Sequence, residues 1–320
     1  MEPPDGAVAG LTGSFDPDSR LVLVDSLRLR TKEGFSVNIA EDLSRIRASD
    51  VDLGRYVTID GARSVTEAVD AMRESGRSCA CIVDRDRLVG VFTQRDVLMR
   101  VLGRPRVCDL PVSEEMSRSP KTLRADQSLA EGLAIMRDWW IRNVPVVEDG
   151  DRLIGNLSWY TVMHTMAAIL NRPSDNDLSE PHFEPGLELV DFSGLNTSSP
   201  VMVSEEATAD VAVHHMQARA IGSLLVVDPR EQLVGILTEF DLLMQLACTG
   251  VHLKDVTVGE MMTTDVVSLS ARSSIAEAIQ QMADKGFSHA PLLGESSRPV
   301  GIATFRDIAA YFEATQESFA

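Results

Sequence analysis

Leu233-Val-Gly-Ile-Leu-Thr-Glu-Phe-Asp241 and Pro299-Val-Gly-Ile-Ala-Thr-Phe-Arg-Asp307 are two copies of the stretch that decides the fold. A third copy is Leu88-Val-Gly-Val-Phe-Thr-Gln-Arg-Asp96, and a fourth is Leu153-Ile-Gly-Asn-Leu-Ser-Trp-Tyr-Thr161. Each places apolar residues around a glycine, then Thr or Ser and, in three copies, Asp three positions later. This pattern predicts a strand that runs into a helix, with the hydroxyl as N-cap and the carboxylate in the first turn. We call this turn the corner.

The spacing of the corners reveals whole repeats. The corner glycines are separated by 65, 80 and 66 residues: Gly90, Gly155, Gly235 and Gly301. A methionine precedes each glycine by 18 or 19 residues, and a capping Ser or Thr precedes each methionine by eight. Three of these caps (Ser64, Ser128 and Ser274) have Glu three residues later, which predicts a reciprocal capping box, whereas Thr208 keeps only the cap. The methionines predict core positions.

Between each methionine helix and its corner lies another apolar strand. The four are Cys79-Ala-Cys-Ile-Val-Asp84, Asn143-Val-Pro-Val-Val-Glu148, Ser223-Leu-Leu-Val-Val-Asp228 and His289-Ala-Pro-Leu-Leu-Gly294. Each unit is therefore predicted to run strand, helix, strand, strand, helix, which defines an α/β fold whose strands need cover on at least one face.

The longest gap between corner glycines holds a polar, Pro-rich stretch with linker composition, 171–185. The units therefore form two pairs, and we expect pairing to complete cores that single units cannot fill. The predicted boundaries are 1–52 for a lead-in, 53–170 for the first pair (53–104 and 113–170), 171–194 for the linker, 195–315 for the second pair (195–248 and 256–315) and 316–320 for a tail. In the lead-in, 1–20 has the composition of disorder, 21–30 is strand-like, and Ile39 to Ile46 predicts a short helix that caps the first unit.

Composition excludes several classes of partner. A formal charge of −18 and a pI near 4.7 argue against nucleic acid and against an anionic membrane. No apolar run approaches the ~18 residues of a membrane span, and the first residues lack a signal-peptide pattern. We therefore expect a cytoplasmic protein.

No residue pattern predicts a metal site or an enzyme. The four cysteines form no CxxC pair, and Cys79 and Cys81 alternate on an apolar strand, which predicts small buried core residues. No nucleophile–base pair, phosphate loop or zinc motif occurs, and the repeats take up nearly all the patterned sequence. Trp139-Trp140 is adjacent on a predicted helix, so we expect one tryptophan in the core and the other at an interface.

The capped helix, the apolar second strand and the Gly-x-x-Thr-x-x-Asp corner together resemble the cystathionine-beta-synthase (CBS) domain. The openings Met116-Ser-Arg-Ser-Pro-Lys-Thr-Leu123 and Met262-Thr-Thr-Asp-Val-Val-Ser-Leu269 also follow the family pattern. The resemblance covers four units, most of 53–315. In this family a tandem pair forms a Bateman module, and two modules pack into a flat, pseudo-symmetric disc, within one chain or between two. The resemblance implies an adenosine-containing regulatory ligand: AMP, ADP, ATP or, in some members, S-adenosylmethionine.

The resemblance also implies roles for the corner residues. The Asp would hold the ribose hydroxyls, the Thr or Ser would contact ribose or phosphate, and the helix start would favour the phosphate. Carried over to this sequence, the candidates are Thr93, Arg95 and Asp96 in the first unit, Ser158 in the second, Thr238 and Asp241 in the third, and Thr304, Arg306 and Asp307 in the fourth. The family's basic position in the second strand falls on Cys79, Asn143, Ser223 and His289, so only the fourth unit keeps a potential cation there. We expect the principal site in 195–315, with Asp241 and Asp307 in two related clefts, and at most one working site in 53–170.

Each of these residues also has a purely structural interpretation. Thr-x-x-Asp before an apolar helix is an ordinary capping box, Arg95 and Arg306 could be exposed helix-start residues, and His289 could be a hydrogen-bonded core histidine. The leading hypothesis is a non-enzymatic regulatory protein, for example an energy sensor, that works as a homodimer or with a regulated protein and has no metal cofactor. The alternative is a ligand-free CBS scaffold that mediates oligomerisation or partner binding.

Overall fold

The computed structural model of the 320-residue chain describes residues 39–54, 56–171, 191–192, 199–294 and 297–317. All of them belong to one compact unit, Phe35–Ala320. The predictions made for residues 1–38 and for most of the linker lie outside the described residues. The predicted lead-in helix is confirmed as α2 (Ile39–Arg45), which is followed by the short helix η2 (Ala48–Asp50).

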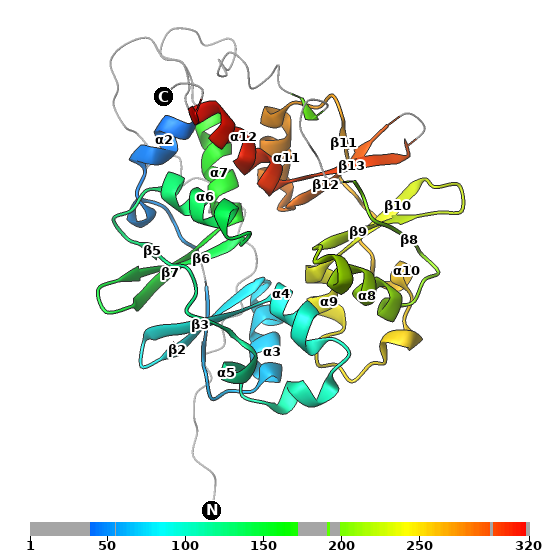
Figure 1. Cartoon of the computed structure of the whole chain (residues 1–320), viewed down its shortest axis with the longest axis horizontal. Coiled ribbons are helices and arrows are strands. Elements are labelled where there is room, and N and C mark those ends of the chain that lie inside the picture. The colour runs from blue at the N-terminus through cyan, green and yellow to red at the C-terminus, as the bar shows by residue number, and fades with distance from the viewer. Residues whose placement is uncertain (1–38, 55, 172–190, 193–198, 295–296, 318–320) are drawn as a thin grey trace, which may run out of the picture. The chain divides into compact units, whose positions relative to one another are not determined.

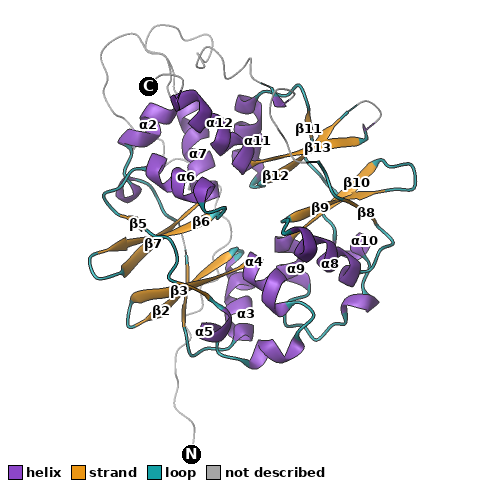
Figure 2. Cartoon of the chain, in the orientation of Figure 1, coloured by secondary structure: helices purple, strands orange, loops and turns teal. Residues whose placement is uncertain are grey.

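Four copies of the predicted strand–helix–strand–strand–helix order follow one another along the chain (Figures 1 and 2). The first consists of β1 (Val57–Asp60), α3 (Val65–Ser75), β2 (Cys79–Asp84), β3 (Arg87–Thr93), α4 (Gln94–Asp96) and the π-helical η3 (Val97–Val101). After η4 (Pro105–Asp109) and α5 (Val112–Glu115), the second consists of β4 (Ser117–Arg118), β5 (Leu123–Arg124), α6 (Leu129–Asp138), β6 (Asn143–Glu148), β7 (Arg152–Ser158) and α7 (Trp159–Leu170). The third consists of β8 (Met202–Ser204), α8 (Ala209–Arg219), β9 (Ser223–Val227), β10 (Leu233–Thr238) and α9 (Glu239–Gln245). After η6 (Leu253–Asp255) and α10 (Val258–Met261), the fourth consists of β11 (Leu269–Ser270), α11 (Ile275–Lys285), β12 (His289–Leu293), β13 (Pro299–Thr304) and α12 (Phe305–Glu317).

Each repeat has a three-stranded arrangement in which the outer strand before the capped helix is parallel, and the corner strand antiparallel, to the central strand; in the second repeat these strands are β5, β7 and β6. In the first pair the two sheets join where β3 meets β7, and β4 adds to β3. The register in every repeat sets the corner hydroxyl residue opposite the first residue of the central strand: Thr93 with Cys79, Ser158 with Asn143, Thr238 with Ser223 and Thr304 with His289. The corner and the start of the second strand therefore share one end of each sheet.

The corner glycines are required by close packing. A Cβ on Gly90 would overlap the side chain of Met116, and a Cβ on Gly235 would overlap that of Met262. These methionines open the partner repeat of the same pair, so the leading segment of one repeat lies across the corner of the other. Gly155 is covered in the same way by Leu53.

The leading segments also complete the helices of their partner repeats. Val65, Leu129 and Ala209 each begin a helix and donate their backbone N–H to a carbonyl of the partner's leading segment, at 2.8–2.9 Å. This exchange satisfies donors that a helix start leaves free. The described part of the lead-in packs on the second repeat and not on the first: Ile46 accepts from Leu129, and α2 packs against α6 and α7.

The upstream capping boxes differ between repeats. The reciprocal boxes predicted in the first two repeats are confirmed (Ser64 with Glu67, Ser128 with Glu131). The fourth is only half formed, because Glu277 accepts from Gln281 Nε2 at 3.0 Å instead of closing the box. In the third repeat the hydroxyl of Thr208 donates to Asp210, so its side chain does not cap the helix backbone as predicted.

The two pairs contact each other repeat by repeat within the chain. One apolar core runs through the first and third repeats and contains, among others, Met72, Leu98, Met216 and Leu243. In the second and fourth repeats, α7 packs against α11 and α6 against α12. The predicted core positions are confirmed, since the four repeat methionines are fully buried and Cys79 and Cys81 are buried too.

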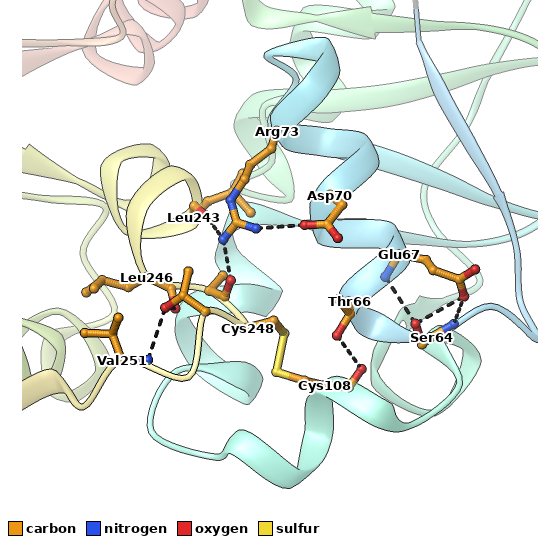
Figure 3. Close-up of a disulfide and its surroundings, with 12 residues drawn as sticks. Ser64, Thr66, Glu67, Asp70, Arg73, Cys108, Leu243, Leu246, Cys248 and Val251 are labelled. Carbon is orange, nitrogen blue, oxygen red and sulfur yellow. Dashed lines mark hydrogen bonds and ion pairs between the residues drawn. A yellow bond between two sulfur atoms is a disulfide. The ribbon is translucent and has the colours of Figure 1, made fainter. Parts of the chain in front are cut away.

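A disulfide joins the first and third repeats (Figure 3). It links Cys108 in η4 to Cys248 after α9, with 5.6 Å between the Cα atoms. Beside it, the guanidinium of Arg73 donates to Leu243 and Met244 carbonyls near the end of α9, at 3.1 and 3.0 Å. The bond was not predicted, because its cysteines lie 140 residues apart. It gives the cytoplasmic expectation no support, since disulfides persist mainly in oxidising compartments.

Candidate functional site

The corner ends of the four sheets meet at a small cavity lined by residues of all four repeats. Its lining consists of Arg95 from the first repeat, Arg142 from the second, Gly222 from the third, and His289, Thr304, Phe305 and Arg306 from the fourth. The structure therefore brings together four of the predicted site residues: Arg95, His289, Thr304 and Arg306. The other candidates lie at the equivalent sheet ends of their own repeats. We call Arg95, Arg142, Glu239, His289 and Arg306 the central cluster.

Glu239 is the carboxylate of this cluster and is completely buried. Its Oε1 lies 2.7 Å from Arg95 Nε, although the N–H is not aligned for a hydrogen bond. Its Oε2 accepts from Arg142 and, at 3.1 Å, from Nε2 of Gln94. One carboxylate of the third repeat thus contacts cations of the first and second.

Arg306 belongs to the cluster and also makes a cation–π contact with an aromatic ring. Its guanidinium carbon lies 4.7 Å from the ring centroid of Trp140, and Nη2 donates to the Trp140 carbonyl at 3.4 Å. Burial, and then the nearby Arg142 and Arg95, lower the pKa of Arg306. A guanidinium whose charge is opposed by burial and by two like charges favours an anion beside it.

The expectation that one tryptophan of Trp139-Trp140 lies in the core is wrong. Trp139 is 57% exposed and Trp140 is 70% exposed. The helical argument fails because α6 ends at Asp138, and Trp140 adopts a positive φ of 57° beyond that end.

His289 is not the cation that its position in the second strand predicted. Burial lowers its pKa well below the ordinary 6.5, and Arg142, Arg306 and Arg95 lower it further. The ring is therefore neutral at neutral pH, and its Nδ1 lies 3.0 Å from the Ser288 hydroxyl. In the second repeat the cation near the start of the central strand is Arg142, which directly precedes the expected position, Asn143.

The corner carboxylates of the third and fourth repeats are half-buried and close the capping boxes of their helices. Oδ2 of Asp241 accepts from the backbone N–H and the hydroxyl of Thr238 at 2.8 and 2.6 Å. Asp307 accepts the same two bonds from Thr304 at 2.6 and 2.7 Å. Burial raises the pKa of both carboxyls, although these hydrogen bonds oppose the rise.

The corners of the first and second repeats differ from these two. Asp96 makes the same bonds to Thr93, but its Oδ1 also lies 3.1 Å from Arg100 Nη1 and accepts from Ser117 at 2.9 Å. In the second repeat Ser158 caps the N–H of Thr161, and the two hydroxyls lie 3.1 Å apart. In the first pair, therefore, the corner carboxylate Asp96 is already paired within the protein, and the other corner has Thr161 in place of a carboxylate.

Sequence reasoning missed Arg142, Gly222 and Glu239. A signal for the first was present, since Arg142 is the one cation among the residues that precede the four central strands: Ser78, Arg142, Gly222 and Ser288. Glu239 gave no signal, because an acidic residue in the first turn of a helix is ordinary.

No three His, Cys, Asp or Glu side chains among the described residues are grouped so as to hold a metal ion. No described helix is long and apolar enough to span a membrane.

Known proteins resemble this chain along most of its length. The meiotically up-regulated gene 70 protein of Schizosaccharomyces pombe is 23% identical over 82% of this chain and 42% of its own length. The CBS domain-containing protein CBSCBSPB5 of Arabidopsis thaliana is 23% identical over 78% of this chain and 50% of its own. The chain thus spans about half the length of these curated relatives.

A solved structure and a family match identify the fold. Protein MJ1225 of Methanocaldococcus jannaschii, described as a suggested archaeal homologue of γ-AMPK, is 18% identical, and the similarity covers 83% of this chain and all of that one. The TM-score is 0.69. The CBS domain itself matches residues 48–103, 109–168, 192–247 and 258–314. The chain therefore belongs to the CBS-domain family, with four CBS domains in two tandem pairs.

Proposed function

We propose that this protein is a non-enzymatic regulatory module that binds an adenine nucleotide, AMP, ADP or ATP. The phosphate lies in the central cluster, and the ribose lies at the corner of the fourth repeat. The observation that carries the proposal is the convergence of three guanidinium groups on one cavity, beside the half-buried corner carboxylate Asp307.

The charge of the central cluster favours an anion. Arg95, Arg142 and Arg306 face a single buried carboxylate, Glu239, while the ring of His289 is neutral. The local charge is thus positive in a chain whose net charge is −18. Guanidinium groups bind phosphate oxygens in bidentate fashion, and such bonds are stronger in a desolvated site.

The corner of the fourth repeat favours a ribose beside this anion. Thr304 lines the cavity and bonds Oδ2 of Asp307. Among the described residues, no hydrogen bond is made to Oδ1 of Asp307, so this oxygen can accept from a hydroxyl. The corresponding oxygen of Asp241, Oδ1, already accepts a long hydrogen bond from the hydroxyl of Thr263 at 3.4 Å. We therefore rank Asp307 ahead of Asp241 as the ribose contact.

Binding at the cluster would change how the repeats pack, because each repeat contributes at least one side chain to it. Membership of the CBS-domain family, whose resemblance implies an adenosine-containing ligand, supports the choice of an adenine nucleotide. The proposed output is altered binding of a second copy of the chain or of a regulated protein.

A thermal-shift panel tests this function. AMP, ADP, ATP, S-adenosylmethionine and adenosine are each titrated to a large excess. A ligand present at 100 times its Kd adds about 2.7 kcal/mol of stability, which corresponds to roughly 5–10 °C in Tm for paired repeats of this size. If none of these compounds raises Tm, the proposed function is wrong.

The alternative, a ligand-free scaffold, is favoured by the first pair. Its corners hold one internally paired carboxylate, Asp96, and one hydroxyl in place of a carboxylate, Thr161. Under this alternative, light scattering finds the same oligomer, and pull-down finds the same partner binding, with and without nucleotide.

A further inference from the structure

Glu239 introduces a negative charge where the geometry gathers positive ones. The residue directly after the corner Thr or Ser is Gln94 in the first repeat, Trp159 in the second and Phe305 in the fourth. Only the third repeat has an acid at this position. The corner does not need it, because Asp241 already closes the capping box there.

The carboxylate of Glu239 is held inside the cluster from several sides. Arg142 and Gln94 donate to Oε2, while Oε1 lies 2.7 Å from Arg95 without an aligned hydrogen bond. Gly222 shows how closely the groups converge. A Cβ there would lie 3.2 Å from Glu239 Oε2, 3.3 Å from His289 Nε2 and 3.4 Å from Arg142 Nη2.

A phosphate group would seek the same donors as this carboxylate. A carboxylate presents two anionic oxygens in a plane and a phosphate presents a tetrahedral set, and guanidinium groups donate hydrogen bonds to both. Two anions that share one desolvated cluster repel each other, because little water screens them. Arg306 differs from the other two arginines, since among the described residues it makes no ion pair with a carboxylate and rests on Trp140 instead.

We propose that Glu239 is a specificity-determining residue, an internal anion that occupies Arg95 and Arg142 and sets how strongly the central cluster binds a phosphate group. The inference rests on the proposed function and deepens it. An incoming phosphate meets Arg306 directly and must share or displace the contacts of Glu239 with the other two arginines. The affinity for the phosphate is therefore held below what three unopposed guanidiniums would give.

The test compares the wild-type chain with Glu239→Gln by calorimetry, with inorganic phosphate, AMP and adenosine as separate probes. Gln keeps the shape and removes the charge. We expect Glu239→Gln to bind inorganic phosphate and AMP at least about tenfold more tightly, because a like charge is removed from a desolvated site. Adenosine affinity should stay within about twofold. The matched control is Glu231→Gln, which makes the same charge change on a side chain that is 66% exposed in the turn between β9 and β10.

Each outcome separates this inference from the proposed function. If Glu239→Gln lowers Tm but leaves phosphate affinity unchanged, Glu239 is only a structural ion-pair partner and the inference is overturned, even where the wild type binds AMP. A gain for inorganic phosphate without binding of adenosine or AMP supports the internal anion while rejecting the nucleotide. Should Glu239→Gln fail to fold, Glu239→Asp withdraws the carboxylate by one methylene and must show a smaller gain of the same sign; no gain overturns the proposal.

Discussion

Two sets of capping boxes in this molecule make the same hydrogen bonds, one set exposed to solvent and the other half-buried. Glu67 and Glu131 cap exposed helix starts, and the bonds from their capping serines lower the pKa of each carboxyl. Asp241 and Asp307 accept equivalent bonds at the corners, yet burial raises their pKa. The exposed boxes show that a helix can be capped without burying a charge. Capping alone therefore does not explain why the corner carboxylates are partly withdrawn from water, and a bound hydroxyl-rich ligand supplies a reason.

The largest expected effect is loss of ligand stabilisation when the corner carboxylates are removed. In Asp241→Ala with Asp307→Ala, the nucleotide-induced gain of about 2.7 kcal/mol at 100 times Kd should disappear. Tm without ligand and circular dichroism show whether the variant is folded. A variant that keeps the full nucleotide shift would mean that these carboxylates only cap helices.

A smaller effect separates capping from binding. Ser64→Ala removes an exposed cap and should reduce the free energy of unfolding by about 1 kcal/mol, with the nucleotide-induced shift unchanged. Thr304→Ala removes the corner cap and should reduce both quantities, because Thr304 lines the cavity. Urea unfolding with and without AMP measures them. Equal nucleotide shifts in the two variants would contradict the distinction between the boxes.

The smallest expected effect is a change in Tm that has opposite signs when a corner carboxylate and an exposed capping carboxylate are each neutralised. Since burial raises the pKa of Asp307 above its ordinary 3.8, the folded protein holds this proton more tightly than the unfolded chain does. The stabilisation gained in this way is complete below pH 3.8 and is lost as the pH rises through the folded pKa. At pH 7 the charged group therefore lowers stability.

Asp307→Asn should accordingly raise Tm without ligand at pH 7, and its advantage over the wild type should vanish near pH 4. The same change at an exposed box, Glu67→Gln, should lower Tm at pH 7, because bonds from Ser64 and Arg63 lower that pKa. Parallel melting curves at the two pH values measure both changes. A fall in Tm for Asp307→Asn at pH 7 would show that the corner carboxylate is stabilising in its own right.

Much of the fold could be predicted because it depends on local patterns. The strand-to-helix corners, the buried methionines and α2 follow from periodicity and capping chemistry, which act within a few residues. The exchange of leading segments could not be predicted in the same way. Leu53 packs against Gly155, and the Ile46 carbonyl accepts a hydrogen bond from Leu129. Both contacts join residues that lie far apart in the sequence, so no local pattern indicates them.

The candidate site was less predictable than the fold, because its charges act through space. The sequence named Arg95 and Arg306 but could not show that they face Arg142 and Glu239 from other repeats. It left open whether His289 is a cation or a hydrogen-bonded core histidine, and only the structure shows that burial beside three arginines lowers its pKa. A pKa depends on the whole surroundings of a group, and residue type gives only its starting value.

The sequence by itself determined four CBS repeats in two pairs, because the spacing of glycine, methionine and cap is repeated along the chain. Only the tertiary structure decided that side chains from the corner ends of all four sheets meet at one cluster, which contains the buried Glu239. The physical reason is the distance along the chain over which each interaction acts. Capping and hydrophobic periodicity act between neighbours in sequence, whereas desolvation and charge act between neighbours in space.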